Sequence, residues 1–298
     1  MDGMRASVDA VVVSYNSRDG LRACVSPLAG LESVHVVVVD NDSPDRSLDA
    51  IADLPVERIQ LEVNGGFAQG TNVGWRAGSA PYVLILNPDA QIAPAALDVL
   101  VAQLDGDPAL GAVAPRIVGH DGQVHYSLRR FPKLRSTYAQ ALFVHRLLPH
   151  AAWADELVRD EAAYEKRSSP DWFSGACILV RREALERIDG LDEGFFLYCE
   201  DIDLCRRLRD EGYDLLFEPA ATCVHAGGAS GDRSELLRVL AESRVRYVYK
   251  HRSRPAAVLE RAGIALGSLV HVAVSRGGAR RRRGHLRAFA AALLTRPV

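Results

Sequence analysis

The stretch that decides the fold is Val83-Leu84-Ile85-Leu86-Asn87-Pro88-Asp89. Its four consecutive apolar residues are too few for a helix and show no polar alternation, which indicates a strand buried on both faces of a sheet. Pro88 ends the strand because it has no N–H to donate to a neighbouring strand. The chain therefore carries Asp89 to the C-terminal edge of a sheet, where open α/β sheets bind ligands. A simple turn is the alternative for an isolated Asn-Pro-Asp.

Two earlier runs predict further strands that end in polar loops. Val8 to Val13 precedes Ser14-Tyr15-Asn16-Ser17, and Val34 to Val39 precedes Asp40-Asn41-Asp42-Ser43. Right-handed crossovers place both loops at the edge of a parallel sheet that Asp89 also reaches. The glycine fingerprint of a dinucleotide fold is missing after the first strand. We therefore expect bound phosphates to be neutralised by another group, such as a metal.

A third strand is expected over Ile59 to Val63, followed by a helix over Phe67 to Ala77. Each glycine inside that helix costs about 1 kcal/mol relative to alanine. Gly70 and Gly74 therefore indicate close approach of a ligand or tight packing on the sheet. The amides of Asn64 and Asn72, near this edge, suit hydrogen bonds to a ligand.

The later sequence predicts an alternation of strands and helices. Residues 133 to 168 lack clear helix or strand boundaries, and we expect a mobile flap over the site. The other predicted elements are a helix from Pro94, a strand over Gly111 to Ala114, a strand-like run over Trp172 to Val180, a helix over Arg182 to Ile188, a helix from Glu200, strands over Tyr213 to Glu218 and Thr222 to Val224, and helices from Ser234 onward.

Two polar features of this second half are candidates for chemistry. The first turn of the helix at Glu200 also holds Asp201 and Asp203. Stabilising the helix dipole, worth about 0.3–1 kcal/mol per acidic residue, would need only one or two of them. His225 follows the last predicted strand and precedes a glycine-rich turn, so it is either a surface residue or a metal ligand.

Composition places the chain among ordinary soluble proteins. Its 298 residues, 48% hydrophobic and 25% charged, suffice for one large domain or two small ones. The five cysteines include no CxxC pair, and the first residues lack the apolar core of a signal peptide. We expect a reducing, cytoplasmic location with free thiols.

Positive charge is concentrated at the C-terminal end. From Arg244 onward twelve arginines and Lys250 oppose Glu260 alone, a net charge of +12, which leaves −14 for residues 1–243. Charge alone fits nucleic acid or an anionic membrane. Residues 256–274 are apolar but interrupted by charged residues, and with the arginines that follow they favour amphipathic helices lying on anionic lipid over a membrane span. A solvated helix packed on the domain is the alternative.

Taken in order, these pieces resemble the bacterial family 2 glycosyltransferases of GT-A fold, and among them the rhamnosyltransferase-like members. The resemblance covers roughly residues 8–230. It rests on Ser14-Tyr15-Asn16, Asp40-Asn41-Asp42-Ser43, Asn64-Gly65-Gly66-Phe67 with Gly70 and Asn72, Asn87-Pro88-Asp89, Trp172 with Gly175-Ala176, Phe196-Leu197-Tyr198 with Glu200-Asp201 and Asp203-Leu204, and His225 with Gly228 and Ser230.

The resemblance implies a role for each part of the site. Asp40 would pair with the base of a nucleotide-sugar donor, and Asp89 would hold Mg²⁺ or Mn²⁺, with His225 as a further ligand because Asn87 replaces the first carboxylate of the family's Asp-X-Asp signature. Asp201 would be the general base, with Glu200 as the second candidate. The other donor-binding residues implied are Ser14, Tyr15, Asn16, Asn41, Asn64, Gly66, Phe67, Asn72 and Asn87; those of the acceptor or sugar pocket are Trp172, Gly175, Ala176 and Tyr198.

The fold implied is α/β: a Rossmann-like GT-A domain with a mainly parallel sheet flanked by helices over residues 1–232, and a helical basic extension over 233–298. The nucleotide-binding half would end near residue 118, and the acceptor side would occupy 119–232. The implied reaction is metal-dependent, inverting transfer of L-rhamnose from dTDP-rhamnose to a polyprenyl-diphosphate-linked sugar at the inner face of the plasma membrane.

Alternatives remain open at this point. They are a different nucleotide-sugar donor, a catalytically inactive scaffold subunit, and an arginine-rich nucleic-acid-binding protein, although the C-terminal end lacks the interleaved aromatic residues of a base-stacking platform. We expect no nucleic acid partner, and a homo-oligomer is possible.

Overall fold

The computed structural model describes residues 7–148, 151–227, 233–274 and 278–296. The chain forms two compact units. Unit 1 comprises Met1–Leu128, Asp160–Gly194 and Glu200–Ser230; unit 2 comprises Arg129–Arg159, Phe195–Cys199 and Gly231–Val298. Besides the expected C-terminal helices, unit 2 thus contains two segments from the middle of the chain.

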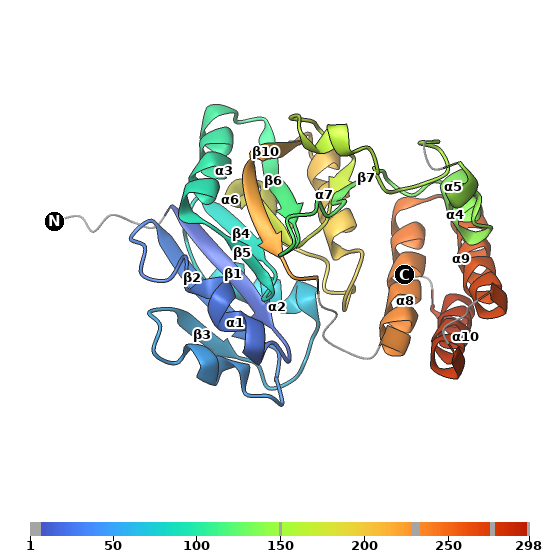
Figure 1. Cartoon of the computed structure of the whole chain (residues 1–298), viewed down its shortest axis with the longest axis horizontal. Helices are drawn as coiled ribbons and strands as arrows, with labels where there is room; N and C mark the ends of the chain where they lie inside the picture. The colour runs from blue at the N-terminus through green and yellow to red at the C-terminus, as the bar shows by residue number, and fades with distance from the viewer. Residues whose placement is uncertain (1–6, 149–150, 228–232, 275–277, 297–298) are drawn as a thin grey trace. The chain divides into compact units, whose positions relative to one another are not determined.

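Unit 1 is built on an eight-stranded sheet in the order β3-β2-β1-β4-β9-β6-β10-β5 (Figure 1). Neighbours among β1 to β4 are parallel, as are β6 and β10, whereas β9 and β5 run antiparallel to their neighbours. The strands are β1 (Val8–Ser14), β2 (Val34–Asp40), β3 (Glu57–Gln60), β4 (Tyr82–Leu86), β5 (Ala90–Ile92), β6 (Leu110–Val118), β9 (Cys177–Arg181) and β10 (Asp214–His225). The mainly parallel sheet confirms the predicted fold class.

Helices cover both faces of this sheet because its central strands are apolar on both sides. Successive residues of a strand point to opposite faces. Val8, Ala10 and Val12 of β1 share a core with α1 and α3, whereas Val11 and Val13 lie under α2. The helices of unit 1 are α1 (Arg18–Val25), α2 (Phe67–Ala77), α3 (Pro94–Gly106), α6 (Arg182–Arg187) and α7 (Glu200–Asp210), with 3-10 turns at Ser47–Ile51 and Glu161–Tyr164.

The two glycines of α2 are explained by packing on the sheet. A Cβ on Gly70 would lie 2.7 Å from Val13 Cγ1, and one on Gly74 would lie 2.4 Å from Val11 Cγ1. Neither position admits a side chain unless the strand moves. Tight packing, one of the two explanations left open by the sequence, therefore accounts for both glycines.

Some element boundaries differ from the prediction. β3 ends at Gln60, so the last part of the predicted strand lies outside it, and the run at Trp172 is divided into β8 (Trp172–Phe173) and β9. The two strands expected after Tyr213 are one strand, β10, with a register shift between Glu218 and Thr222. This register shift is a property of the pairing between β10 and β6, so the periodicity of the sequence alone does not reveal it.

Unit 2 is helical, with α4 (Leu134–Ala141), α5 (Val144–Leu147), α8 (Arg233–His251), α9 (Arg254–Val274) and α10 (Gly278–Leu294); the short strand β7 (Leu128–Arg129) begins at its boundary with unit 1. Small residues such as Ala241 and Ala288 let α8 and α10 approach closely. The stretch predicted to be a flap contains α4, which packs against α9: a Cβ on Gly263 would lie 2.9 Å from Thr137 Cγ2.

One helix among the described residues, α9, is long and apolar enough to cross a membrane by length and composition. It also packs against α4, α8 and α10. Its Glu260 is buried and lies 3.7 Å from Arg252.

Candidate active site

Three strand ends meet at one edge of the unit 1 sheet, as the sequence predicts. The parallel register of β1 and β2 places Ser14 opposite Asp40, and the Asn41 N–H donates to the Ser14 carbonyl over 2.8 Å. β4 runs on the other side of β1 and ends at Leu86, opposite Val12. The turn Asn87-Pro88-Asp89 therefore leaves the sheet at this same edge (Figure 1).

Three polar atoms are buried at this edge of the sheet. Asp40 is 1% exposed; its Oδ1 accepts from the Ser43 N–H at 2.7 Å and from Gln60 Nε2 at 3.0 Å. Its Oδ2, Ser14 Oγ and Asn41 Oδ1 lack any hydrogen-bond partner among the described residues. Buried polar groups are rarely left unsatisfied, and each costs about 1–3 kcal/mol. A ligand with N–H or O–H donors would satisfy all three.

The loops beside Asp40 hold the other predicted donor residues. Asn16 has φ 53° and donates its N–H to Ser43 Oγ at 3.1 Å, while Tyr15 is 38% exposed. Gly66 has φ 90°; its N–H donates to Asn64 Oδ1 and its carbonyl accepts from Asn41 Nδ2, both at 3.0 Å. Phe67 follows as the first residue of α2 and is partly buried.

The contacts of Asn72 do not support the prediction that it binds the nucleotide-sugar donor. Its Nδ2 donates to the Leu191 carbonyl at 2.8 Å and to Glu193 Oε1 at 2.9 Å. Its Oδ1 accepts from Trp75 Nε1 at 3.0 Å and from the Leu191 N–H at 2.9 Å. An amide has two donors and two acceptor positions, and the protein itself fills all of them. Asn72 therefore fastens α2 to residues 191–193 and has no capacity left for a nucleotide.

Asp89 and His225, far apart in the sequence, are in contact. His225 Nε2 lies 3.0 Å from Asp89 Oδ1. The contact arises because β5 pairs antiparallel with the end of β10, which places Ala90 opposite His225, and because the Ala226 N–H donates to the Asp89 carbonyl. β5 was not predicted, so only the family resemblance, which implies a cation shared by Asp89 and His225, placed the two side chains together.

The contact between Asp89 and His225 fits the divalent cation that the family resemblance implies. The carboxylate and the imidazole lie within hydrogen-bonding distance of each other, so both would hold a cation bound between them. Carboxylate and imidazole together suit Mn²⁺. No group of three or more His, Cys, Asp or Glu residues that could hold a metal occurs in the described parts of the chain, so oxygen atoms of a diphosphate would have to complete the coordination.

A short segment links the acidic helix to the Asn-Pro-Asp turn. The Gly175 N–H donates to Asp201 Oδ2 at 3.1 Å, and the next carbonyl, that of Ala176, accepts from the Asn87 N–H at 2.9 Å. A Cβ on Gly175 would lie 3.2 Å from Asp201 Cβ, so a larger residue would crowd the carboxylate. The carboxylate of Asp201 and the turn that carries Asp89 are thereby held in one hydrogen-bonded arrangement.

The three carboxylates of α7 lie in three different environments. Asp203 is fully buried and pairs with Arg207 at 2.7 Å. Burial raises the pKa of Glu200 to about 8, and the neighbouring Asp201 and Asp203 add to the rise. Asp201 is partly buried, and its Oδ1 accepts from the Ile202 N–H at 2.8 Å. Glu200 is therefore mostly protonated at neutral pH and cannot accept a proton there.

The remaining predicted residues are distributed between the two units. Trp172 is buried in β8 of unit 1, and the following Ser174 N–H donates to the Ser127 carbonyl at 3.0 Å. Tyr198 belongs to unit 2 and has φ 69°. Gly228 and Ser230, part of the resemblance, lie outside the described residues.

Two polar residues of the site were missed by sequence reasoning. Gln60 contacts Asp40, and the His125 ring packs edge-on against that of His225 with centroids 6.2 Å apart. Neither belongs to a motif. Only the strand order, which brings β3 beside β2, could have revealed Gln60.

The sequence of this chain matches that of a known family over the region that forms this site. The sequence profile described as Glycosyl transferase family 2 matches residues 9–189, more than half of the chain. The chain belongs to this glycosyltransferase family. All three strand ends and the Gly175-Ala176 segment of this glycosyltransferase lie inside the matched range.

Individual relatives agree with the family assignment. The N-acetylglucosaminyl-diphospho-decaprenol L-rhamnosyltransferase of Mycobacterium tuberculosis is 30% identical over 294 residues, which cover 92% of this chain and 95% of the relative. Rhamnosyltransferase WbbL of Escherichia coli is 24% identical over 230 residues, which cover 72% of this chain and 81% of WbbL. The predicted resemblance to rhamnosyltransferase-like members of the family is thereby confirmed.

A solved structure agrees with the fold. Mannosyltransferase PcManGT from Pyrobaculum calidifontis, in complex with GDP-Man and Mn²⁺, has a TM-score of 0.59 and 19% identity, with 97% of this chain and 86% of that chain covered. This glycosyltransferase therefore has the predicted GT-A fold with a helical C-terminal extension.

Proposed function

We propose that this glycosyltransferase transfers L-rhamnose from dTDP-rhamnose to a hydroxyl of a polyprenyl-diphosphate-linked sugar, in the assembly of a cell-wall or surface polysaccharide. Glycosyl transfer by the Asp89 and Asp201 site rests on one observation above all: Gly175 and Ala176 tie Asp201 to the turn that carries Asp89. The sugar and the acceptor rest on the mycobacterial relative, which aligns over nearly its whole length.

Donor recognition would take place at the strand ends. The unpaired Oδ2 of Asp40 is an acceptor for the imide N–H of a thymine or uracil base. Ser14, Tyr15 and Asn16 lie in the adjacent loop. A bound Mg²⁺ or Mn²⁺, held by Asp89 and His225, would offset negative charge on the leaving diphosphate.

Acceptor activation would be the task of Asp201. As general base it takes the proton of the acceptor hydroxyl while the oxygen attacks the anomeric carbon and the bond to the diphosphate breaks, with inversion. Two backbone N–H groups fix the orientation of its carboxylate. Trp172, Gly175 and Ala176 of unit 1 are the residues that we assign to the sugar pocket.

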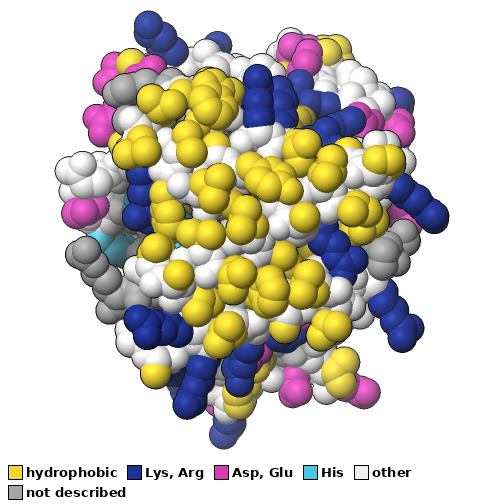
Figure 2. Space-filling model, turned by 90° about the vertical axis from the view of Figure 1, so that its right-hand side faces the viewer, with side chains coloured by type: hydrophobic (Ala, Val, Ile, Leu, Met, Phe, Trp, Pro, Cys, Tyr) yellow, Lys and Arg dark blue, Asp and Glu magenta, His cyan; other side chains and the backbone are white. Residues whose placement is uncertain are grey.

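Contact with the inner face of the membrane would come from unit 2. Figure 2 shows hydrophobic side chains spread across one face and bordered by Lys and Arg. Exposed leucines occur on α9 and α10, and Arg280 to Arg283 are exposed on α10. Binding to nucleic acid requires positive charge but no exposed apolar side chains. The apolar side chains among these arginines therefore favour anionic lipid. The large hydrophobic residues that are exposed on the described parts of these helices are Val258, Leu259, Leu269, Val274, Leu286, Leu293 and Leu294.

Donor profiling with the purified protein tests the proposal. Turnover should be greatest with dTDP-rhamnose and a polyprenyl-diphosphate-linked N-acetylglucosamine acceptor. Preference for another nucleotide sugar would retain the glycosyltransferase and reject the donor. A salt-sensitive DNA shift without any hydrolysis of nucleotide sugars would instead favour nucleic acid binding.

A further inference from the structure

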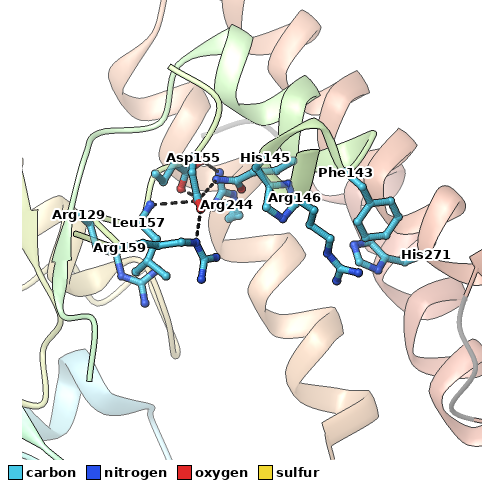
Figure 3. A pocket seen from close by; sticks show the side chains of 11 residues that line it. Arg129, Phe143, His145, Arg146, Asp155, Leu157, Arg159, Arg244 and His271 are labelled. Carbon is cyan, nitrogen blue, oxygen red and sulfur yellow. Dashed lines mark hydrogen bonds and ion pairs between the residues drawn. The ribbon is translucent and has the colours of Figure 1, made fainter. Parts of the chain in front are cut away.

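Asp40 has different partners from the other buried aspartates in the described parts of the chain. Each of the others pairs with an arginine; Arg159 Nε, for example, lies 2.7 Å from Asp155 Oδ2 (Figure 3). Asp40 takes part in no ion pair among the described residues, and its hydrogen bonds come from two neutral groups, the Ser43 N–H and the Gln60 amide. A buried carboxylate without a counter-charge costs free energy unless hydrogen bonds satisfy it. Asp40 is therefore suited to accept a hydrogen bond from a further donor.

The two oxygens of the Asp40 carboxylate differ in what they can still accept. Oδ1 accepts from the Ser43 N–H at 2.7 Å and from Gln60 Nε2 at 3.0 Å. A carboxylate oxygen accepts about two hydrogen bonds, so Oδ1 is saturated. Oδ2 is buried and has no hydrogen-bond partner among the residues that the structure describes. The side chain therefore offers a ligand one acceptor atom instead of two.

Gln60 reaches Asp40 because of the sheet register. β3 ends at Gln60, and the parallel pairing of β2 with β3 places Gln60 opposite Asp40. Gln60 Nε2 also donates to the Leu61 carbonyl at 3.1 Å, so both of its hydrogens are used. Because the Gln60 side chain is exposed, these two hydrogen bonds rather than core packing hold the amide against Oδ1.

The attachment of β3 to the sheet does not require the Gln60 side chain. Backbone pairing joins residues 37–40 to residues 57–60, and the Leu61 N–H donates to the Asp40 carbonyl at 2.9 Å. Substitutions of exposed side chains usually change stability little. The Gln60 amide can therefore be removed while the strand stays in place, and the effect of its removal falls on Asp40.

We infer that Gln60 determines which base the donor site accepts, because it occupies Asp40 Oδ1 and leaves Oδ2 for the single imide N–H of uracil or thymine. This role rests on the proposed function, in which Asp40 binds the base of the donor. Gln60 is a positioning residue, since it acts through the Asp40 carboxylate and needs no contact with the base.

Guanine presents a different set of donors on its pairing edge. Its N1–H and one N–H of its amino group lie side by side, so together they match the two oxygens of a free carboxylate. With Oδ1 saturated, one of these donors would be buried without a partner, which weakens binding. Cytosine has the ring size of uracil but carries an acceptor at N3, which would face the acceptor Oδ2. The free oxygen of Asp40 therefore favours uracil and thymine over both of these bases.

Calorimetry of nucleoside diphosphates that bind to the full chain in Mn²⁺ tests this role of Gln60. We expect dTDP and UDP to bind the wild type at least about tenfold more tightly than GDP or CDP. In Gln60→Ala, Oδ1 becomes available to the second donor of guanine, so the preference for dTDP over GDP should shrink about tenfold. The preference for dTDP over CDP depends on Oδ2 alone and should persist. A merely structural role would weaken all four nucleotides alike, and unchanged affinity ratios would overturn the proposal.

Two further variants show whether Gln60 acts through Asp40. Gln123→Ala removes an exposed glutamine side chain elsewhere in unit 1 and should preserve every affinity. Asp40→Asn removes the carboxylate, so adding Gln60→Ala to it should leave the ratio of the dTDP and GDP affinities unchanged. If Gln60→Ala narrows this ratio equally with and without Asp40→Asn, Gln60 acts independently of Asp40 and the proposal fails.

These measurements are independent of the sugar and of its transfer. If the enzyme transfers a sugar other than rhamnose, the affinity ratios of the nucleoside diphosphates still report the role of Gln60. Equal binding of GDP and dTDP by the wild type would reject that role. It would leave the transfer of rhamnose, which donor profiling measures, as a separate result.

Discussion

The Gly175 N–H donates a hydrogen bond of 3.1 Å to Oδ2 of Asp201. The adjacent Ala176 carbonyl accepts from Asn87, so the position of the proposed base depends on the same segment that supports the Asn87-Pro88-Asp89 turn. A carboxylate held in this way is oriented before the substrate arrives, which favours proton transfer.

Asp201→Asn should lower turnover by about 10²–10⁴-fold, because an amide cannot accept the proton of the acceptor hydroxyl. Donor affinity, measured by calorimetry with dTDP-rhamnose, should stay near that of the wild type. Asp210→Asn, at the exposed end of the same helix, is the control and should retain activity. Near-normal turnover in Asp201→Asn would reject the assignment.

Glu200→Gln should flatten the pH dependence of stability. The pKa of Glu200 in the folded protein is about 8, against an ordinary value of 4.5. Between these values the folded state holds a proton that the unfolded state has lost, so stability falls as pH rises, by about 1.4 kcal/mol per pH unit at most. Glutamine cannot ionise and removes this loss. Denaturant unfolding at pH 5 and pH 8 measures the fall in the free energy of unfolding. An equal fall in the wild type and in Glu200→Gln would contradict the prediction.

Asp89→Asn and His225→Ala should both weaken Mn²⁺ binding. Asp89→Asn should have the larger effect, because it removes the negative charge as well as a ligand. We expect a loss of about tenfold or more for His225→Ala, measured by Mn²⁺ electron paramagnetic resonance with dTDP present. His120→Ala, an exposed histidine of unit 1, should bind as the wild type does. Removal of the metal with EDTA should stop transfer by the wild type, and full activity in EDTA would reject the cation.

Leu286→Glu combined with Leu294→Glu should reduce binding to phosphatidylglycerol vesicles. The two side chains are 47% and 78% exposed, so the change spares the core, whereas deleting α10 would uncover the buried Ala241 and Val245 of α8. Each leucine that inserts into lipid contributes about 1.5–3 kcal/mol, so the loss should exceed about tenfold. Val63→Glu, 67% exposed in unit 1, is the control. Unchanged sedimentation of the double variant would reject the membrane face.

Several features of the site followed from local sequence. The buried run of β4, its end at Asn87-Pro88-Asp89 and the helix that starts at Glu200 all appear as predicted. The parallel arrangement that brings Ser14, Asp40 and this turn to one edge also follows, because crossover handedness fixes it.

Other features depended on partners that local patterns do not encode. Asn72 had the chemistry of a ligand-binding amide, but Leu191 and Glu193, more than a hundred residues later, use its hydrogen bonds. Likewise the three similar carboxylates on α7 lie in different environments because burial and Arg207 act on them unequally.

The sequence by itself determined the strands, the helices and the polar residues at the sheet edge, because apolar periodicity and chain-breaking residues act within a few positions. The tertiary structure alone decided that the pairing of β5 with β10 brings His225 to Asp89, and that Glu200 stays protonated at neutral pH. These outcomes depend on which distant groups share a buried space, since burial and pairing set the free energy of a polar group far more than its neighbours in sequence do.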